Sequence, residues 1–367
     1  MNQERLNYLD LVKGVGIVLV VVGHSPGVPE NVIMWLFSFH MPLFYVVSGV
    51  LFAYRNSVQE PFALYLRNRL CSTMLPYLWF SLINIFVDCV RYFFNPEVVG
   101  REVLRVDILQ TLSFFGISVL WFLPTLFLGE LCLYGLIRKC PVWLICIVGA
   151  IGAWIPPVGT WLVNTYISGE GKVLLTWLGY ILTALLRVPS ALTFLLVGHA
   201  AYFALQRRRM KASLEVLLGA CCLLLNVVVE FVNAGEALHY LVLNNVLYYY
   251  LGAVSASLGL IMVCRHIKPF RFLVFLGKNS LIIMLTHLDC RVMRVAILFA
   301  TSANQLLPNA VVFHVSLYLA LLLGELFMII LINRFGFFLI GRKEPVKMES
   351  PKEWYTSIRE ATERKKE

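Results

Sequence analysis

The chain has 367 residues, of which 59% are hydrophobic and 14% are charged, and its mean hydropathy is +0.78. Soluble domains average about 45–50% apolar and about 25% charged residues, so this composition excludes an ordinary soluble protein and indicates an integral membrane protein. The net charge of +10 does not indicate nucleic-acid binding, because the cations form short clusters between apolar segments, the pattern of membrane-orientation signals.

The apolar segments predict an all-α, polytopic bundle of about ten transmembrane helices. A membrane-spanning helix needs roughly 17–25 mainly apolar residues. By this measure the spans lie near residues 9–25, 31–54, 70–93, 118–138, 141–158, 188–206, 213–232, 241–264, 277–300 and 309–333. The first segment has no small-residue cleavage site, so we expect it to remain as a helix rather than to be removed as a signal peptide.

The distribution of Lys and Arg predicts that both termini are cytoplasmic. With that orientation the inner segments carry 22 cations, and the outer loops carry only four: Arg101, Arg105, Lys172 and Arg187. Positive charge collects on the cytoplasmic side of membrane proteins, and an even number of spans agrees with both ends lying there. We therefore expect a multi-pass protein of the inner or plasma membrane.

The sequence divides into a membrane domain, 1–341, and a charged cytosolic tail, 342–367. No repeat or Pro/Gly-rich linker divides the first part, and the tail is poor in aliphatic residues. Within the longest outer connection, the apolar stretch 172–187 is short for a span. We expect an interfacial or re-entrant helix there, beside the outer opening of a site; if the stretch spanned, the argument from an even number of spans would fail.

The nine cysteines predict no metal centre and no disulfide framework. Most lie inside apolar runs, and no Cys-x-x-Cys pair or zinc-type His–Cys spacing occurs. We interpret them as small hydrophobic residues.

Lys13 and His24 are the strongest candidates for a functional site. Eleven positions correspond to about three helical turns, so both side chains are expected on one face, about 16 Å apart. Placing a cation and an imidazole against lipid would be costly, and the pair is therefore expected to face the bundle interior or a wet cavity. A residue pair of this kind indicates a functional site, whereas the alternative for His24 is an interfacial histidine at a helix end.

Further polar residues fall inside the predicted spans. His40 and His287 lie well inside the second and ninth, and Arg67 with Arg69 lies at the inner mouth of the third. In the ninth, three residues at helical i, i+4 and i+7 spacing are expected to share a face: His287, Arg291 and Arg294. Glu130 and Glu325 are mid-span, and the sequence assigns them no role. Together the three histidines and the cations indicate a reaction or transport chamber.

Taken in order, several motifs of the chain resemble those of a known family. The Lys13-to-His24 spacing, FHMPLFYVVSG (39–49), Arg-x-Arg before LPY (67–77), WFLP (121–124), PSALTFLLVG (189–198) and GKNSLIIMLTH (277–287) resemble the acyltransferase-3 family of membrane O-acyltransferases. The likeness covers about 5–335 and is greatest to the fucose 4-O-acetylase and intercellular-adhesion-protein-C branch. The wider family has Arg where this chain has Lys13, which argues against a bidentate clamp there. We expect no fused SGNH transferase domain, because the tail is too short to hold one.

The resemblance implies an O-acetyltransferase that moves an acyl group, usually acetyl, from cytosolic acetyl-CoA to a hydroxyl of an extracytoplasmic glycan or lipid-linked sugar. His24 is our candidate general base, since imidazole suits proton transfer near neutral pH. Arg67 and Arg69 are expected to bind the CoA phosphates, and Lys13 the pantetheine arm or thioester carbonyl. His40 and His287 orient His24, stabilise the oxyanion or serve as structural polar groups; the sequence does not rank these roles.

Other interpretations of these residues stay open. A transporter or flippase would also place polar side chains in a membrane cavity but need not bind acyl-CoA, and a purely structural membrane protein would leave the Lys13–His24 face unexplained. Arg67 and Arg69 also fit a positive-inside signal, and Arg291 and Arg294 fit snorkelling toward outer headgroups. Expected partners are the bilayer, the acceptor sugar and polysaccharide-biosynthesis machinery. The histidines at 199, 239, 266 and 314 receive no role.

Overall fold

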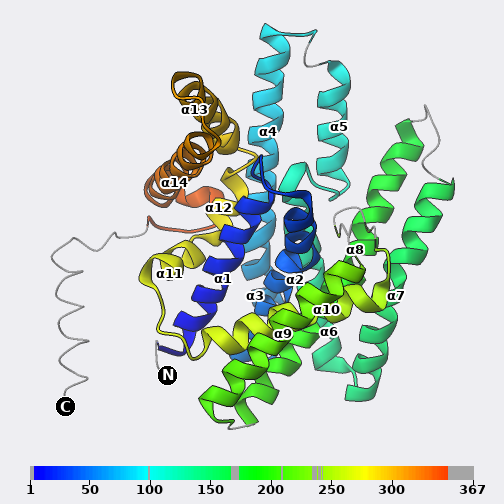
Figure 1. The fold of residues 1–367 in the computed structure, drawn as a ribbon. Coiled ribbons are helices and arrows are strands. Elements are labelled where there is room, and N and C mark those ends of the chain that lie inside the picture. Colours follow the sequence, from blue (N-terminus) through cyan, green and yellow to red (C-terminus); the bar gives the residue numbers. More distant parts are fainter. Residues whose placement is uncertain are drawn as a thin grey trace.

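The computed structural model describes residues 4–97, 100–166, 173–207, 210–233, 238, 241 and 243–345, and the described part consists of helices with no strands (Figure 1). The helices are α1 (Glu4–Gly23), α2 (Glu30–Tyr54), η1 (Ser57–Gln59), α3 (Phe62–Arg69), η2 (Leu70–Met74), α4 (Leu75–Phe94), α5 (Arg101–Leu112), η3 (Ser118–Trp121), α6 (Phe122–Lys139), α7 (Val142–Tyr166), α8 (Val173–Arg207), α9 (Ala212–Val232), α10 (Val246–Cys264), α11 (Arg271–Lys278), α12 (Ser280–Thr286), α13 (Val292–Leu306), α14 (Ala310–Arg334) and η5 (Phe337–Ile340). The predicted cytosolic tail lies outside the described residues from 346 onward.

The fold is an all-α polytopic membrane bundle, as the composition predicts. Among the described residues, eight helical segments are long and apolar enough to cross a membrane. They are 30–54, 62–94, 118–139, 142–161, 174–207, 212–232, 246–264 and 310–334. The count of ten spans and the cytoplasmic location of the termini stay predictions.

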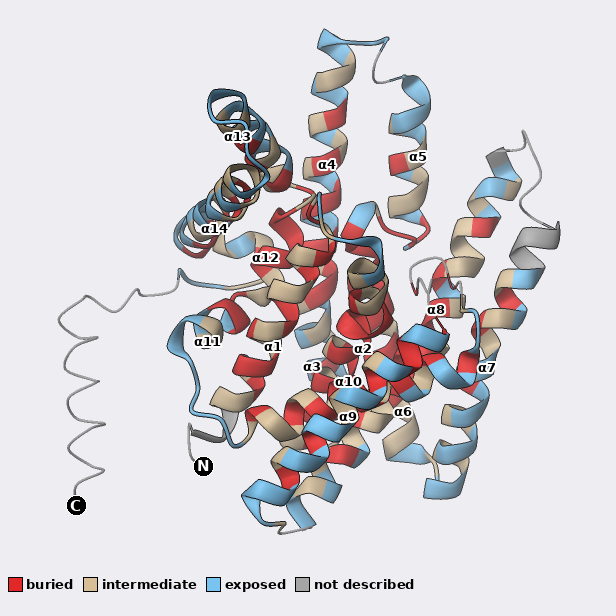
Figure 2. Ribbon diagram, viewed as in Figure 1, coloured by how far each residue is buried: buried red, intermediate tan, exposed pale blue. Residues whose placement is uncertain are grey.

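The buried core lies where α1, α2, α8 and α10 meet in the middle of the bundle (Figure 2). In α2 most residues from Leu36 to Ala53 are buried. Helices at the periphery, such as α7, α9 and α14, expose large apolar side chains. An outer apolar surface of this kind suits contact with lipid, because lipid tails are as apolar as the side chains themselves. His40, in the middle of α2, is therefore buried away from the lipid-facing surface.

Glycines allow the central helices to approach closely. A Cβ atom added at Gly49 of α2 would lie 2.1 Å from the carbonyl oxygen of Leu195, and one added at Gly198 of α8 would lie 2.0 Å from that of Val46. The same relation joins α1 to α11, where a Cβ at Gly14 would lie 1.9 Å from the Leu273 oxygen. Small residues at helix crossings in membranes bring the two backbones together in this way.

The expectation for 172–187 is wrong. Residues 173–187 are not a separate interfacial or re-entrant helix but the first part of α8, which continues without a break to Arg207 and contains Pro189. The predicted span beginning at 188 therefore begins in the middle of a helix. Arg187, which we expected in an outer loop, is 1% exposed inside the bundle.

The predicted ninth span, 277–300, is not one helix. It is divided into the end of α11, the short α12, a turn at 287–291 and α13, and Arg291 has a left-handed backbone with φ of 61°. His287, Arg291 and Arg294 consequently do not share a helical face, so that expectation is wrong. The predicted third span, by contrast, is part of a longer helix, since α3 continues into α4 through the single π-helical turn η2.

Candidate active site

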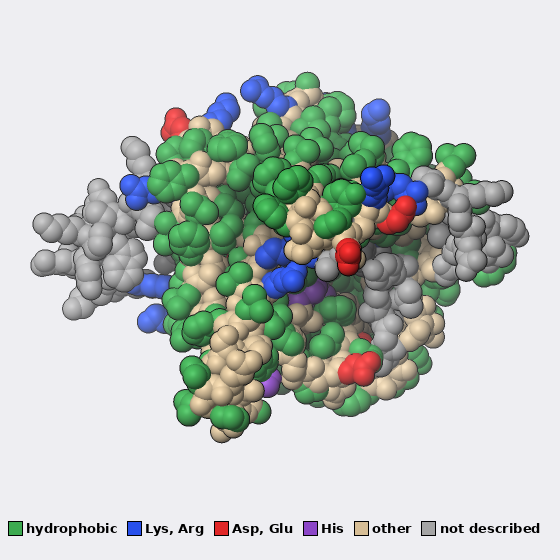
Figure 3. Space-filling model, turned by 90° about the horizontal axis from the view of Figure 1, so that it is seen from above, with side chains coloured by type: hydrophobic (Ala, Val, Ile, Leu, Met, Phe, Trp, Pro, Cys, Tyr) green, Lys and Arg blue, Asp and Glu red, His purple; other side chains and the backbone are tan. Residues whose placement is uncertain are grey.

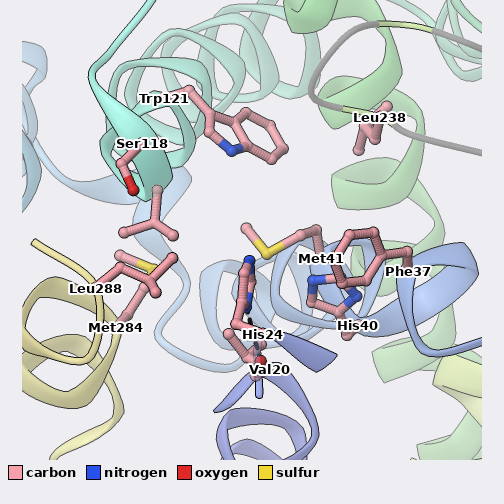
Figure 4. Close-up of a pocket in the computed structure, with 11 residues that line it drawn as sticks. Val20, His24, Phe37, His40, Met41, Ser118, Trp121, Leu238, Met284 and Leu288 are labelled. Carbon is pink, nitrogen blue, oxygen red and sulfur yellow. Dashed lines mark hydrogen bonds between the residues drawn. The ribbon is translucent and has the colours of Figure 1, made fainter. Parts of the chain in front are cut away.

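A cavity of about 280 Å³ lies between the end of α1, α2, η3 and α12 (Figure 4). It is lined by Val20, His24, Phe37, His40, Met41, Ser118, Val119, Trp121, Leu238, Met284 and Leu288. In Figure 4 the Trp121 indole and Ser118 lie across the cavity from the His24 ring, and two methionines lie on either side of that ring. Three of the predicted functional elements, around His24, His40 and His287, therefore converge on one place.

Each of the three histidines has its tautomer fixed by the backbone. The Nδ1 atoms of His24, His40 and His287 lie 2.8, 2.6 and 2.9 Å from the carbonyl oxygens four residues earlier. A carbonyl oxygen only accepts hydrogen bonds, so in neutral histidine Nδ1 carries the proton and donates it. The Nε2 atom is then left with a lone pair that can accept a proton.

The three imidazoles form a compact cluster. The ring centroid of His24 lies 5.2 Å from that of His287 and 6.4 Å from that of His40, and Phe37 packs against both His24 and His40. His287 is fully buried, and its Nε2 has no hydrogen-bond partner in the described part of the chain. In the view from above, histidine lies near the centre of the face beside basic side chains (Figure 3). Of the three, His24 and His40 line the cavity, and a neutral imidazole whose Nδ1 donates to the backbone can accept a proton at Nε2.

The break after α12 places His287 in this cluster. Thr286, the last residue of α12, donates a hydrogen bond of 2.6 Å to Glu325 of α14, and the Met293 amide donates one of 2.9 Å to the His287 carbonyl. Further along the turn, Arg291 donates to Asp88 of α4 at 3.1 Å. The turn is thus joined to both α4 and α14, and Glu325 and Arg291 have structural contacts that the sequence did not reveal.

The ion pair of Arg291 belongs to a polar network at the end of α4. Asp88 also accepts a hydrogen bond from Arg91 at 2.5 Å. Burial, together with the neighbouring Asp88 carboxylate, raises the pKa of Asp107 on α5 to about 6. This network connects α5 and α4 to the turn that follows the histidine cluster.

The structure does not bring Lys13 to the cavity. Its Nζ lies 2.7 Å from the Asp10 carboxylate on the same helix, and Lys13 is not among the lining residues. The role predicted for Lys13 on the donor remains a prediction, but the expectation that Lys13 and His24 line one wall of one cavity does not hold for this cavity.

Arg67 and Arg69 have different surroundings although they are two residues apart. Arg67 is exposed. Arg69 forms an ion pair with the buried Glu130 at 3.2 Å and lies over the ring of Tyr65. The donor-binding role of the two arginines stays a prediction, and of the two Arg67 is the one whose charge is exposed to a ligand.

Arg187 is the main residue beside the cavity that sequence reasoning missed. Its guanidinium lies 5.2 Å from the centre of the Trp121 ring and 4.3 Å from that of Phe115, and it donates a hydrogen bond of 2.8 Å to the Phe115 carbonyl. A buried arginine between two aromatic rings fixes the position of both by cation–π attraction. Its place two residues before the PSALTFLLVG motif was the available signal.

Comparison with known proteins gives one family. The sequence profile of the family described as an acyltransferase domain matches residues 6–332, which is nearly the whole of the described chain. No curated protein and no solved structure matches the chain. Among the described residues, no group of three His, Cys, Asp or Glu side chains is placed to hold a metal ion.

Proposed function

The chain belongs to the acyltransferase-3 family of membrane acyltransferases, and from this premise we propose that it is an O-acetyltransferase using cytosolic acetyl-CoA as donor. The proposed acceptor is a hydroxyl of an extracytoplasmic glycan or of a lipid-linked sugar, and the proposed location is the inner or plasma membrane. The observation that carries the proposal is the position of His24 at the wall of the cavity with Nδ1 2.8 Å from the Val20 carbonyl oxygen, which leaves Nε2 unprotonated in the neutral ring.

In this proposal His24 is the general base. A sugar hydroxyl is a weak acid and needs its proton removed as its oxygen attacks the thioester carbonyl. His24 Nε2 takes that proton, the new C–O bond forms, and the C–S bond to CoA breaks. The CoA thiolate then receives the proton from His24, which returns the imidazole to its neutral state. His40 and His287 are proposed to orient His24 or to stabilise the charge that develops.

The proposed donor site lies at the opposite end of the pantetheine arm from the reacting carbonyl. Arg67 and Arg69 are the proposed partners of the CoA phosphates, because arginine binds phosphate through its planar fork. Lys13 is proposed to contact the pantetheine arm or the thioester carbonyl. We also propose that the protein works beside polysaccharide-biosynthesis machinery, which would supply the acceptor.

The experiment replaces His24 by alanine and measures transfer of radiolabelled acetyl from acetyl-CoA to the glycan of membranes from the producing cells. We expect a loss of about 10²–10⁴-fold in rate, the usual effect of removing a general base. Binding of acetyl-CoA to the purified variant should be unchanged, because His24 does not contact the CoA phosphates in this proposal.

His314→Ala is the matched control. The Nδ1 of His314 also lies 2.7 Å from the carbonyl four residues earlier, but His314 is not among the residues lining the cavity. The His314→Ala variant should transfer acetyl at the wild-type rate. Full activity of His24→Ala would remove His24 from the base role, whereas failure of the wild-type protein to bind acetyl-CoA would favour the transporter interpretation and overturn the proposed function.

A further inference from the structure

The polar groups in the cavity lining are mostly hydrogen-bond acceptors. Because Nδ1 of His24 and of His40 donates to the backbone, each imidazole presents an unprotonated Nε2. The third acceptor is the Ser118 hydroxyl oxygen, and the Trp121 indole N–H is a donor. A lining dominated by acceptors fits a ligand that brings several O–H donors.

Ser118 is held in an unusual conformation at the start of η3. Its φ is 49°, in the left-handed region that non-glycine residues rarely adopt, and its side chain is exposed at the cavity wall. Non-glycine residues persist in this region when the surrounding structure enforces it, often at ligand sites. The conformation places a hydroxyl across the cavity from His24 (Figure 4).

Asp289 interacts with the Ser118 hydroxyl. Asp289 lies in the turn after α12, is 3% exposed, and interacts through its carboxylate with the Ser118 hydroxyl and the Asn84 side chain. Serine has a single O–H proton, so when that proton is directed at Asp289 the lone pairs of Ser118 remain for a ligand. The second carboxylate oxygen, Oδ2, is buried with no hydrogen-bond partner in the described part of the chain, and Asp289 itself does not line the cavity. The part that Asp289 can play is therefore to hold Ser118.

We propose that Ser118 and Asp289 form an acceptor subsite that recognises a second hydroxyl of a polyhydroxylated substrate, while the first hydroxyl is deprotonated at His24. Ser118 contacts the substrate directly, and Asp289, which does not line the cavity, is a positioning residue that orients Ser118. The substrate class is therefore a ring-sized polyol in which a neighbouring hydroxyl stands next to the one that is acylated.

The size and walls of the cavity agree with this class. Its volume of about 280 Å³ is slightly below the roughly 300–1,000 Å³ of sites for drug-sized ligands, so it suits one ring-sized unit. The Trp121 indole forms one wall (Figure 4), and its face can pack on the C–H groups of a saccharide ring. Arg187 lies 5.2 Å from the centre of the same indole and helps to fix its position.

The inference rests on the proposed function, and its test compares two reactions of the same enzyme. Acetyl transfer to membrane glycan needs a positioned polyol, whereas slow hydrolysis of acetyl-CoA needs only water and His24. We expect Ser118→Ala and Asp289→Asn to lower glycan acetylation at least tenfold and to leave acetyl-CoA hydrolysis and binding within twofold of wild type.

Two matched controls accompany these variants. Ser113→Ala removes a buried hydroxyl in the same segment that bonds to the Gln110 carbonyl, and Glu230→Gln changes a buried carboxyl on α9. Neither residue lines the cavity. Both variants should retain wild-type glycan acetylation.

The possible outcomes distinguish failure of the Ser118–Asp289 subsite from failure of the proposed function. Equal loss of transfer and hydrolysis in Asp289→Asn would mean that the carboxylate only supports the turn carrying His287, and it would overturn the subsite. Unchanged transfer in both variants would overturn it as well. A wild-type protein that neither hydrolyses nor transfers acetyl from acetyl-CoA would overturn the proposed function, and the subsite with it.

Small defined acceptors test the second hydroxyl directly. With purified protein and acetyl-CoA, we expect 1,2-cyclohexanediol to be acetylated at least tenfold faster than cyclohexanol at equal concentration. In Ser118→Ala this preference should fall to less than threefold. A wild-type enzyme that does not favour the diol would overturn the proposal.

Discussion

The histidine at position 24 acquires its chemistry from two separate features. The contact of Nδ1 with the carbonyl four residues earlier is local, and His314 makes the same contact on α14. What distinguishes His24 is the convergence of His40 and His287 on it and the cavity in front of it. The local contact fixes the tautomer, and the tertiary packing decides which of the histidines has a place to use it.

The two arginines at the end of α3 are expected to respond differently to substitution. Arg67→Gln should weaken acetyl-CoA binding at least tenfold, since a charge-assisted hydrogen bond contributes roughly 1.5–3 kcal/mol, without changing thermal stability. Arg69→Gln should instead destabilise the protein by roughly 3–5 kcal/mol, because it leaves the buried Glu130 carboxylate unpaired. Calorimetric unfolding and acetyl-CoA titration in detergent at fixed ionic strength measure the two effects.

The control for Arg69 is the double variant Arg69→Gln with Glu130→Gln. Removing both charges should restore most of the stability, because no uncompensated ion remains. If Arg67→Gln binds acetyl-CoA as tightly as the wild type, Arg67 is an orientation signal and not a donor-binding residue. If a third variant, Arg67→Gln with Arg69→Gln, also binds acetyl-CoA as tightly as the wild type, the donor site lies elsewhere.

At the level of helices, α2 carries three of the residues that line the cavity, Phe37, His40 and Met41, and it packs closely on α8. Two of the motifs noted in the sequence, FHMPLFYVVSG and PSALTFLLVG, end in the glycines of this crossing, Gly49 and Gly198. Hydrophobic periodicity identifies such helices but does not say which residues touch a neighbouring backbone. The close approach of α2 to α8 therefore explains why these motifs end in glycine. The same packing fixes the position of α2 and so of His40, which lies on it.

Substitution of Gly198 by alanine should separate these two helices. The new Cβ would lie 2.0 Å from the Val46 carbonyl oxygen, so the backbones must shift, and we expect a loss of about 1–3 kcal/mol or more in stability. Gly135→Ala in α6 is the matched control, because no described atom beyond its chain neighbours and the adjoining backbone of α6 lies within 4 Å of the added Cβ, and alanine favours helix by up to about 1 kcal/mol. Thermal unfolding in detergent should show a lower midpoint for Gly198→Ala only; equal midpoints would contradict the packing argument.

The whole molecule is expected to sit with its α4–α5 connection outside and its α6–α7 connection inside the cell. In a variant lacking the nine native cysteines, we predict that Glu97→Cys reacts with a membrane-impermeant maleimide in intact cells. Lys139→Cys should react only after permeabilisation. Both positions are exposed, so accessibility depends on the side of the membrane rather than on burial. Labelling of Lys139→Cys alone in intact cells would reverse the predicted topology and place His24 on the cytoplasmic side.

The sequence by itself determined the membrane class, the all-α architecture and the family, and it identified His24, His40 and His287 as site candidates. Apolar runs, and the titratable residues within them, can be recognised in the sequence because a membrane-spanning segment must be mainly apolar and a titratable residue inside it is costly. Only the tertiary structure decided that the ninth segment breaks at His287, that residues 173–187 continue into α8, and that Arg69 pairs with Glu130 whereas Arg187 stacks on Trp121. The break at His287 and the two arginine contacts involve partners distant in sequence, and a hydrophobic pattern does not specify which helices will lie side by side.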